Sequence, residues 1–348
     1  RILFISVKYM NLLIINKIIL FVSTLLFIYI LSCSNHDVNL NSNISAYNDC
    51  CYAPDGEKIT TENEYKSWLD MNKKNYKIPS EMSLILGGEI WIGSESGLAN
   101  EKPVFQTEVQ PFLMDKRMVT VAEFRDFIEE TGYVTEAEKF GDGVVFDFKK
   151  STWVLLPNAT WDYPQGPLAE KANDNHPVTM LSYSDADEYL SWVDKRLPTE
   201  VEWEHAARGI SLRDNPYSWG QELKENDSTY MANTWNGVFP IMNTIDDGYL
   251  TTSPVGTFGT NQFDLSDMGG NVWEWTSDWY RSYENYNQPY IINPASQKVL
   301  RGGSFLCHTS YCHGYRVSAR SYTPIDNSMF HIGFRGVKSI DYNVDKYK

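Results

Sequence analysis

The sequence predicts an α+β fold with little regular secondary structure, long loops and many packed aromatic side chains. Helix signals are confined to the part of the chain before Gly209. Beyond it the chain is a run of Gly, Asn, Asp and Ser with short strand-like pieces, and this run carries much of the Trp and Tyr. A purely polar run would indicate disorder, whereas aromatic residues at this density indicate packing. At 348 residues and 42% hydrophobic content, the chain can form one large domain or at most two.

The best-marked helix is expected to begin after Thr120 and to end at Gly132. Thr120 and Glu123 have the spacing of a capping box, and Gly commonly ends a helix in a left-handed conformation. Between them apolar residues recur at helical spacing and predict a core-facing side: Val121, Phe124, Phe127 and Ile128.

Three other helices are predicted with less complete signals. One is expected to begin at Ser184, with Ala186, Tyr189, Leu190 and Val193 facing inward. Another begins at Thr199, with Glu202 at the capping-box position and Gly209 after its end. A short amphipathic helix is expected within residues 59–74.

The compact domain is predicted to span residues 81–340. It starts near Met82, where the apolar run 84–86 leads through Gly87 and Gly88 into the alternating segment 90–92, as expected of two strands and a turn. Residues 33–80 are interpreted as a tether with a short linker helix, because 34–48 are rich in Asn and Ser. No internal repeat is evident.

The first 32 residues have the pattern of an export signal. Met10 is the expected start, Lys17 precedes an apolar run from Ile18 to Leu31, and Ser32 and Cys33 follow. The end of this run also resembles a bacterial lipobox, in which the cysteine, here Cys33, becomes lipidated. We expect an exported lipoprotein on a membrane facing the periplasm or cell surface; an uncleaved signal anchor is the alternative.

Charge excludes one class of partner. The whole chain has 30 basic and 45 acidic residues, and three of the basic ones, Arg1, Lys8 and Lys17, lie in the first 32 residues, which hold no acid. The remainder therefore has 27 basic and 45 acidic residues, a net charge of −18. Such a surface repels phosphate backbones, so nucleic acid is not an expected partner, whereas hard cations are compatible with it.

Four cysteines remain besides Cys33. Cys50 and Cys51 are adjacent, a spacing that disfavours a bond between them, and their role stays open. Cys307 and Cys312 are five positions apart in Cys-His-Thr-Ser-Tyr-Cys-His. A disulfide is the plain interpretation in an exported protein, although so short a loop gains only about 2 kcal/mol. The alternative is a soft-metal or redox site, because thiolates favour Cu(I) and His308 and His313 lie beside them.

Several segments resemble the formylglycine-generating enzymes, also called sulfatase-modifying factors, over about residues 80–338. The segments are 131–141 (Thr-Gly-Tyr-Val-Thr-Glu-Ala-Glu-Lys-Phe-Gly), 195–203 (Lys-Arg-Leu-Pro-Thr-Glu-Val-Glu-Trp), 270–279 (Gly-Asn-Val-Trp-Glu-Trp-Thr-Ser-Asp-Trp), Gly302-Gly-Ser and Gly333-Phe-Arg. Most of these occur throughout the wider superfamily and indicate only the fold, which is related to C-type lectins. The pair Cys307 and Cys312 is more specific, because it marks the catalytic branch.

The resemblance implies a definite chemistry. Such enzymes bind an unfolded sulfatase segment containing Cys-x-Pro-x-Arg and oxidise its cysteine to Cα-formylglycine with O2. Cu(I) would be held by Cys307 and Cys312, while Ser304 and Tyr311 would line the oxygen pocket. Trp273 would shape the pocket wall, with Trp275 and Trp279 in the core. His308 is a weaker candidate for handling protons or thiolates.

The resemblance also implies two structural Ca²⁺ sites. Asn233, Thr234, Asp247 and Tyr249 would form the first; Asp267, Gly270, Val272 and Glu274 would form the second. Mixed carboxylate and carbonyl oxygens are what Ca²⁺ accepts. Taken without the resemblance, Asp246-Asp247-Gly248 and the segment 267–270 would be interpreted as ordinary turns.

Some positions depart from the family pattern. Four apolar or small residues stand where vertebrate-type enzymes carry two disulfides: Leu190, Ala207, Val317 and Gly336. Asp162 stands where the family usually has Arg, and His331 where it usually has Asn. We assign Asp162, His331 and Arg320 to the peptide groove, so the exact substrate motif is open.

Three other functions compete with the oxidase. A non-catalytic lipoprotein scaffold in an envelope complex is the main alternative, although such members typically lack the cysteine pair. An iron-dependent sulfoxide synthase would need a His-rich helical domain, and nothing of that kind precedes residue 80. The third is a calcium-dependent, lectin-like binding module. We expect a monomer whose partners are the unfolded sulfatase, O2 and the membrane.

Overall fold

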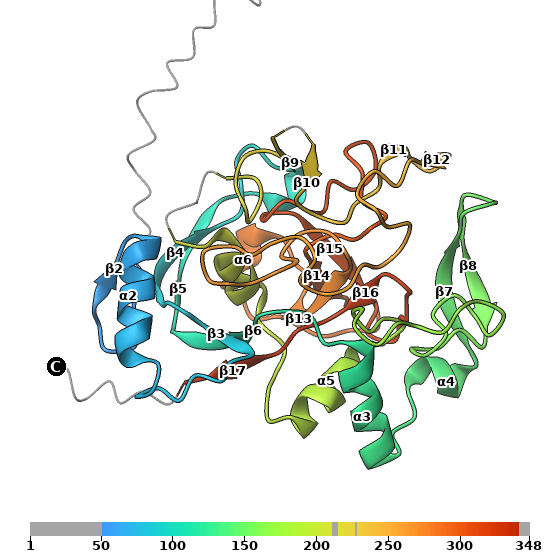
Figure 1. Ribbon diagram of the computed structural model, residues 1–348, viewed down its shortest axis with the longest axis horizontal. Coiled ribbons are helices and arrows are strands. Elements are labelled where there is room, and N and C mark those ends of the chain that lie inside the picture. The colour runs from blue at the N-terminus through green and yellow to red at the C-terminus, as the bar shows by residue number, and fades with distance from the viewer. Residues whose placement is uncertain (1–50, 211–214, 227, 341–348) are drawn as a thin grey trace, which may run out of the picture. The chain divides into compact units, whose positions relative to one another are not determined.

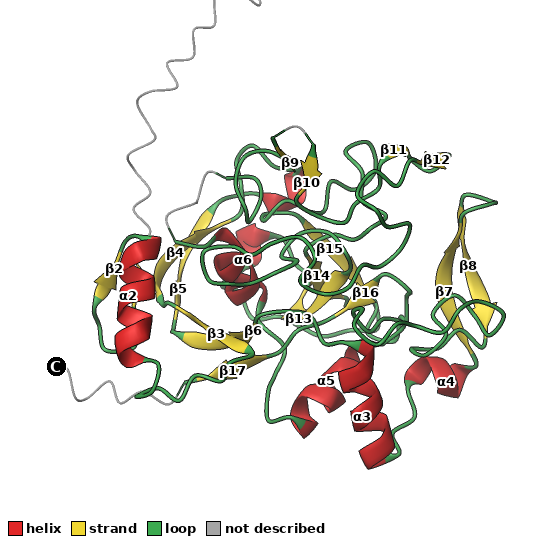
Figure 2. Ribbon diagram, viewed as in Figure 1, coloured by secondary structure: helices red, strands yellow, loops and turns green. Residues whose placement is uncertain are grey.

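The computed structural model describes residues 51–210, 215–226 and 228–340, all within the compact unit Asp49–Lys348. Short helices and strands are joined by long loops (Figures 1 and 2). The predicted α+β, loop-rich fold is therefore confirmed. The predicted export signal, the lipidated Cys33 and the stalk 34–48 lie outside the described residues.

The central sheet has four strands in the order β15-β14-β13-β16. β13 (Trp273–Trp279) pairs antiparallel with β14 (Lys298–Arg301) and parallel with the short β16 (Ile332–Gly333), while β15 (Arg320–Thr323) borders β14. The parallel pair places Trp273 opposite Ile332, so the start of β13 lies beside the segment that contains His331.

A second sheet joins an early segment of the chain to its C-terminal segment, because β6 (Phe112–Asp115) lies between β3 (Met82–Ile85) and β17 (Val337–Ser339). The other strands form two-stranded pairs. They are β1 (Cys51–Tyr52) with β2 (Lys58–Ile59), β4 (Gly88–Ile92) with β5 (Phe105–Val109), β7 (Asp142–Asp147) with β8 (Thr152–Pro157), β9 (Lys224–Glu225) with β10 (Thr229–Tyr230), and β11 (Gly237–Val238) with β12 (Met242–Asn243).

Two predicted helices begin and end at the expected residues. α3 (Val121–Thr131) has the Thr120–Glu123 capping box and ends at Gly132, which has φ of 68°. α6 (Glu200–Arg208) has the Thr199–Glu202 box and is followed by Gly209. Local hydrogen bonds determine both starts, which explains why the sequence alone predicted them.

The start of α5 (Tyr183–Trp192) was predicted two residues too late. Ser182, rather than Ser184, accepts the hydrogen bond from the backbone N–H of Asp185, and Asp185 completes the box. The predicted inner residues Ala186, Tyr189 and Leu190 are buried. Another short helix, α4 (Glu136–Phe140), was not predicted, although Thr135 and Glu138 form a capping box before it and Gly141 ends it.

The N-terminal boundary of the domain was also predicted too late. α2 (Glu62–Asn72) confirms the helix expected within 59–74, but residues 51–80 are part of the folded body rather than a tether. Cys51, Ile59 and Trp68 are at most 3% exposed and belong to the same core cluster as Leu84. Their burial needs a complementary surface supplied by the rest of the chain, which the local pattern does not reveal.

Loops after α6 are held by aromatic packing, as predicted. Trp275 is fully buried, and Tyr283 is buried in the 3-10 turn Tyr283–Asn285. The other 3-10 turn of the described chain, Ala99–Glu101, precedes α6 and buries Glu101. No α-helix follows α6 in the described part of the chain.

At one position where a disulfide was noted as absent, the chain packs tightly instead, since a Cβ on Gly336 would lie 2.6 Å from Leu190 Cδ2. Of the described helices, none is long and apolar enough to cross a membrane.

Buried ion pairs connect α6 to the central sheet. Arg301 on β14 is fully buried and donates to Glu200 and Glu204 of α6. Burial raises the pKa of Glu204, but the charges of Arg208 and Arg301 outweigh it and hold that pKa below its usual value. The network fixes the strand that leads directly into the cysteine loop.

Candidate active site

Cys307 and Cys312 lie on the loop that follows β14. Gly302 and Gly303 have φ of 93° and 74°, and a Cβ on Gly303 would lie 2.6 Å from the backbone nitrogen of Tyr315. Glycine is therefore required for the chain to turn sharply out of the sheet. The two cysteines are joined as a disulfide with their Cα atoms 5.3 Å apart. Cys307 is 1% exposed, whereas Cys312 is half-buried.

Ser304 is fully buried and holds Cys307 in place. Its backbone N–H donates to Cys307 Sγ at 3.4 Å, and its carbonyl accepts from the N–H of Cys307 at 2.8 Å. The Ser304 hydroxyl accepts from the N–H of Leu306 at 3.3 Å, which leaves its own hydrogen to donate. The structure thus places Ser304 against Cys307, whereas its role in an oxygen pocket stays a prediction.

Trp273 lies against the same sulfur. A Cβ on Gly314 would be 2.6 Å from the Trp273 ring and 3.0 Å from Cys307 Sγ, so Gly314 is the point at which the ring and the sulfur meet. Trp273 and both cysteines belong to one hydrophobic cluster. Gly314 was not predicted to belong to the site. Its position two residues after Cys312 was a signal that the chain passes close to the pair.

Tyr311 and His308 point in other directions. The Tyr311 ring is 51% exposed and stacks on Phe239, with the ring centroids 4.2 Å apart. His308 Nδ1 interacts with Ser310 Oγ at 2.8 Å, within the loop itself. The geometry therefore places Tyr311 on the surface next to Cys312 and gives His308 a local structural contact.

The donor set at this loop suits a soft metal ion. A hydrogen bond to Cys307 Sγ favours the thiolate form once the pair is reduced, and two adjacent thiolates are ligands that Cu(I) accepts. Glycine at position 314 lets the backbone pass close to both the sulfur and the Trp273 ring, where a Cβ would clash. In the structure the sulfurs are bonded to each other, so metal binding requires the reduced pair. No group of three or more His, Cys, Asp or Glu able to hold a metal occurs among the described residues.

The residues predicted for the first calcium site are brought together. Asp247 accepts from the N–H of Thr234 at 2.9 Å and of Tyr249 at 3.1 Å. Asn233 is 1% exposed, and its Oδ1 has no hydrogen-bond partner within the described chain. Burial raises the pKa of Asp247, a shift that a bound cation would oppose. A buried amide oxygen without a partner, next in sequence to a residue whose N–H donates to a half-buried carboxylate, fits a hard cation.

The second predicted calcium set has a different arrangement. Both oxygens of Glu274 accept from Arg335, at 2.7 and 2.8 Å, and Oε2 also accepts from Trp203 Nε1 at 3.0 Å. Asp267 accepts from the N–H of Gly256 at 2.6 Å. The guanidinium of Arg335 already neutralises Glu274, so the geometry fits calcium better at the first set than at the second, which also included Gly270 and Val272.

The three predicted groove residues behave differently. The assignment of Arg320 to the peptide groove was wrong. Its buried guanidinium forms a bidentate pair with Glu200 and also donates to the Asn100 carbonyl. Arg320 is therefore part of the α6 ion network and is not free to bind a peptide. A buried partner more than a hundred residues away is not visible in the local sequence. Asp162 is partly exposed, with Lys171 3.2 Å from one of its carboxylate oxygens.

His331 is buried beside the active-site strand. Its carbonyl accepts from the N–H of Trp273 at 2.9 Å, and its ring packs on Trp153 with the centroids 4.9 Å apart. Burial lowers the pKa of His331 to about 3, so the ring is neutral at physiological pH. A small pocket of about 110 Å³ is lined by Lys171, the partner of Asp162, and by Phe330, the neighbour of His331, but by neither Asp162 nor His331 itself.

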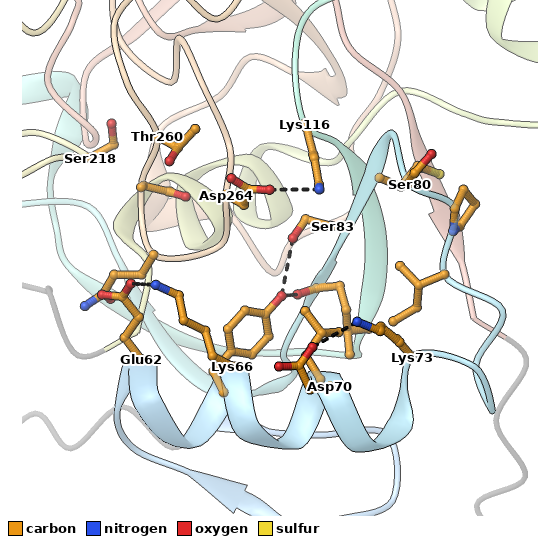
Figure 3. A pocket seen from close by; sticks show the side chains of 18 of the residues that line it. Glu62, Lys66, Asp70, Lys73, Ser80, Ser83, Lys116, Ser218, Thr260 and Asp264 are labelled. Atoms are coloured by element: carbon orange, nitrogen blue, oxygen red, sulfur yellow. Dashed lines mark hydrogen bonds and ion pairs between the residues drawn. The ribbon is translucent and has the colours of Figure 1, made fainter.

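A larger pocket, of about 720 Å³, is lined by none of the residues of the cysteine site. It lies between α2 and the loop that carries Asp264 (Figure 3). Its charged groups are paired with one another as Glu62–Lys66, Asp70–Lys73 and Lys116–Asp264. The site defined by the cysteine pair is therefore separate from this pocket.

The fold and the cysteine loop define a protein of the formylglycine-generating class. A family model for the sulfatase-modifying factor enzyme 1-like domain matches residues 69–340, and the chain belongs to this family. It is 39% identical over 279 residues to the formylglycine-generating enzyme of Streptomyces coelicolor, covering 73% of this chain and 88% of that protein. It is 41% identical over 254 residues to the enzyme of the same name from Mus musculus, covering 68% of each.

Two further similarities limit what homology alone establishes. The chain is 36% identical over 291 residues to a Bos taurus protein named inactive C-alpha-formylglycine-generating enzyme 2, covering 77% of this chain and 90% of that protein. The solved structure of PvdO from Pseudomonas aeruginosa superposes with a TM-score of 0.57 at 22% identity, covering 74% of this chain and 94% of that one. The latter similarity supports the fold alone.

Proposed function

We propose that the protein is a formylglycine-generating oxidoreductase of sulfatase maturation. It oxidises the cysteine of a Cys-x-Pro-x-Arg segment in an unfolded sulfatase to Cα-formylglycine, using O2. One observation carries the proposal. In a chain of this family, Cys307 and Cys312 lie within bonding distance, one buried against Trp273 and the other half-exposed beside Tyr311.

The residues of the loop have separate tasks in this proposal. Cys307 and Cys312, once reduced, would hold Cu(I), which when bound supplies the one-electron chemistry with O2 that side chains lack. Ser304 fixes Cys307 through its backbone, and its hydroxyl, which accepts from Leu306, retains a hydrogen that it can donate. Trp273 excludes water from the buried sulfur, while the half-exposed Cys312 is where a peptide thiol can approach.

The test is a turnover measurement with a peptide containing Cys-Thr-Pro-Ser-Arg. Reduced protein is loaded with Cu(I), incubated in air with the peptide and followed by mass spectrometry for the mass loss of formylglycine formation. Cys307→Ser and Cys312→Ser are each expected to lower the rate by about a thousandfold or more, because each removes one ligand. Thr309→Ala, an exposed change in the same loop, is the matched control and is expected to retain turnover.

The alternative is a non-catalytic lipoprotein scaffold. It is favoured by the bond between the two sulfurs and by the similarity to a relative named as inactive. On this view Cys307 and Cys312 form a permanent staple. Absence of both turnover and copper binding in protein whose cysteine pair has been reduced would contradict the oxidase and leave the scaffold.

The proposed location is the outer side of a membrane, with Cys33 lipidated and the folded unit meeting sulfatases before they fold. It rests on the basic, apolar and small-residue order of residues 17–33. Cys33→Ala is expected to move the protein from the membrane fraction to the soluble extract, whereas an uncleaved anchor would keep the variant in the membrane fraction. In solution we propose a monomer stabilised by Ca²⁺ at the Asn233 set.

A further inference from the structure

An exposed apolar surface adjoins the cysteine loop. We call it the hairpin patch and define it as Val238, Ile241, Met242, Ile245 and Tyr311, whose side chains are 40–82% exposed. Val238 and Met242 are directly opposite each other in the β11–β12 pair and so share one face of the hairpin. Figure 1 shows β11 and β12 at the periphery of the fold. A contiguous exposed apolar surface commonly marks a binding site.

The hairpin is attached to the cysteine loop at two points. The N–H of Trp235, two residues before β11, donates to the Cys307 carbonyl at 3.1 Å. Phe239, at the hairpin turn, stacks on Tyr311 with an angle of 16° between the rings. Tyr311 directly precedes Cys312, so the patch is continuous with the half-exposed cysteine.

The base of the hairpin is fixed while its apolar tip is displayed. Asn236 is 4% exposed; its carbonyl accepts from Thr244 at 3.0 Å and its Oδ1 accepts from Asp247 at 2.8 Å. Phe239 also packs on Phe146 and Trp235. The support is therefore rigid, and the exposure of Ile241 at 82% is a property of an ordered surface.

We propose that the hairpin patch binds apolar side chains that flank the target cysteine in the unfolded substrate; this rests on the proposed function. An unfolded segment exposes apolar residues that the mature sulfatase buries, so contact with them selects chains that have not yet folded. Tyr311 places the patch next to Cys312, where the target thiol must arrive. Apolar contacts also let this strongly acidic protein bind a substrate segment whatever the charge of that segment.

The test measures binding without turnover. Fluorescein-labelled peptides carry Ser in place of the target cysteine and six added residues on one side or the other, a reach of about 20 Å when extended. Each extension contains either two Leu or two Gln. Anisotropy titrations are expected to give a Kd about tenfold lower for the Leu peptide than for the Gln peptide on at least one side. The double variant Ile241→Ser/Met242→Ser is expected to reduce that ratio to about one.

Controls separate the patch from general hydrophobicity and from the activity itself. Ile291→Ser/Ile292→Ser removes two similarly exposed isoleucines elsewhere and is expected to preserve the ratio. Equal Kd values for Leu and Gln peptides, or equal losses in both double variants, overturn the proposal. Turnover of the minimal peptide without a Leu preference refutes the patch and leaves the activity intact, whereas a patch-dependent preference without turnover refutes the activity alone. Self-association that Ile241→Ser/Met242→Ser abolishes, with no Leu preference, assigns the patch to a second copy instead.

Discussion

Buried polar groups are arranged differently around α6 and around the cysteine pair. At α6 every carboxylate oxygen of Glu200 and Glu204 accepts a hydrogen bond, from Arg208, Arg301, Arg320 or their neighbours. Elsewhere several buried polar atoms have no partner within the described chain, among them Trp161 Nε1, Asp162 Oδ1, Asn233 Oδ1, Trp235 Nε1 and His331 Nδ1. Trp235 and His331 are hydrogen-bonded through their backbones to Cys307 and Trp273 of the site.

This difference separates scaffold from site. Carboxylates whose oxygens are all paired inside the chain stabilise one arrangement of the loops and have no capacity left for a ligand; in this network only Arg301 Nε has no partner among the described residues. Polar atoms without an internal partner need solvent, an ion or a peptide to satisfy them. Polar atoms that remain available to a ligand therefore include those of residues hydrogen-bonded to the cysteine site. The ion network keeps β14 and the start of the cysteine loop in place.

The largest expected effect on stability is at Arg301. Arg301→Met removes a guanidinium that neutralises two buried carboxylates, and should lower the free energy of unfolding by about 3–5 kcal/mol in urea titrations. Arg117→Met, which breaks the half-exposed pair with Glu123, should cost no more than about 1 kcal/mol. Equal losses in the two variants would remove the distinction between the two regions.

Removal of the calcium proposed at the Asn233 set should have the next largest effect. A cation bound there would stabilise the folded state by about 2.7 kcal/mol at a free concentration one hundred times its Kd. EGTA is therefore expected to lower the Tm, and Asn233→Ala to abolish the response to added Ca²⁺. A Tm that is insensitive to both EGTA and Ca²⁺ would show that Asn233 Oδ1 is satisfied by solvent.

His331 should make stability depend on pH. Its folded pKa, about 3, lies below the unfolded value near 6.5, so the unfolded state binds the proton first as pH falls. The stabilising contribution is complete above pH 6.5 and is lost toward pH 3, at up to about 1.4 kcal/mol per pH unit. His331→Asn should flatten the profile in that window. A profile unchanged by this substitution would mean that His331 has the same pKa in the folded and unfolded states.

The smallest effect is expected at Asp162. Its Lys171 pair is partly exposed and its other oxygen has no internal partner, so Asp162→Asn should change the free energy of unfolding by about 0.5 kcal/mol or less. The same urea titrations used for Arg301 measure it. A loss above about 2 kcal/mol would place Asp162 in the scaffold rather than in the site.

What the sequence predicted well depends on near neighbours. The boxes at Thr120 and Thr199 involve residues three positions apart, and Cys307 and Cys312 belong to one short loop, so their proximity was readable. The start of α5 was misplaced because two serines two residues apart could each cap it, and only the hydrogen bonds of Asp185 decide.

What it missed depends on distant partners. Trp68 is buried by the rest of the domain, Arg320 is taken up by Glu200, and Glu274 is neutralised by Arg335. None of these contacts has a local signal. The hairpin patch was missed for the same reason, since a short apolar run such as Ile241-Met242 has the same composition whether it is buried or displayed.

The central claim is that Cys307 and Cys312 are a ligand pair and not a structural staple. The most direct measurement is a Cu(I) titration of the reduced protein against a competing chelator, repeated with Cys307→Ser and Cys312→Ser. The account predicts one Cu(I) per chain for the reduced protein and a loss of affinity of at least about a hundredfold in each variant. A reduced protein that takes up no Cu(I), or takes it up equally well without either sulfur, would contradict it.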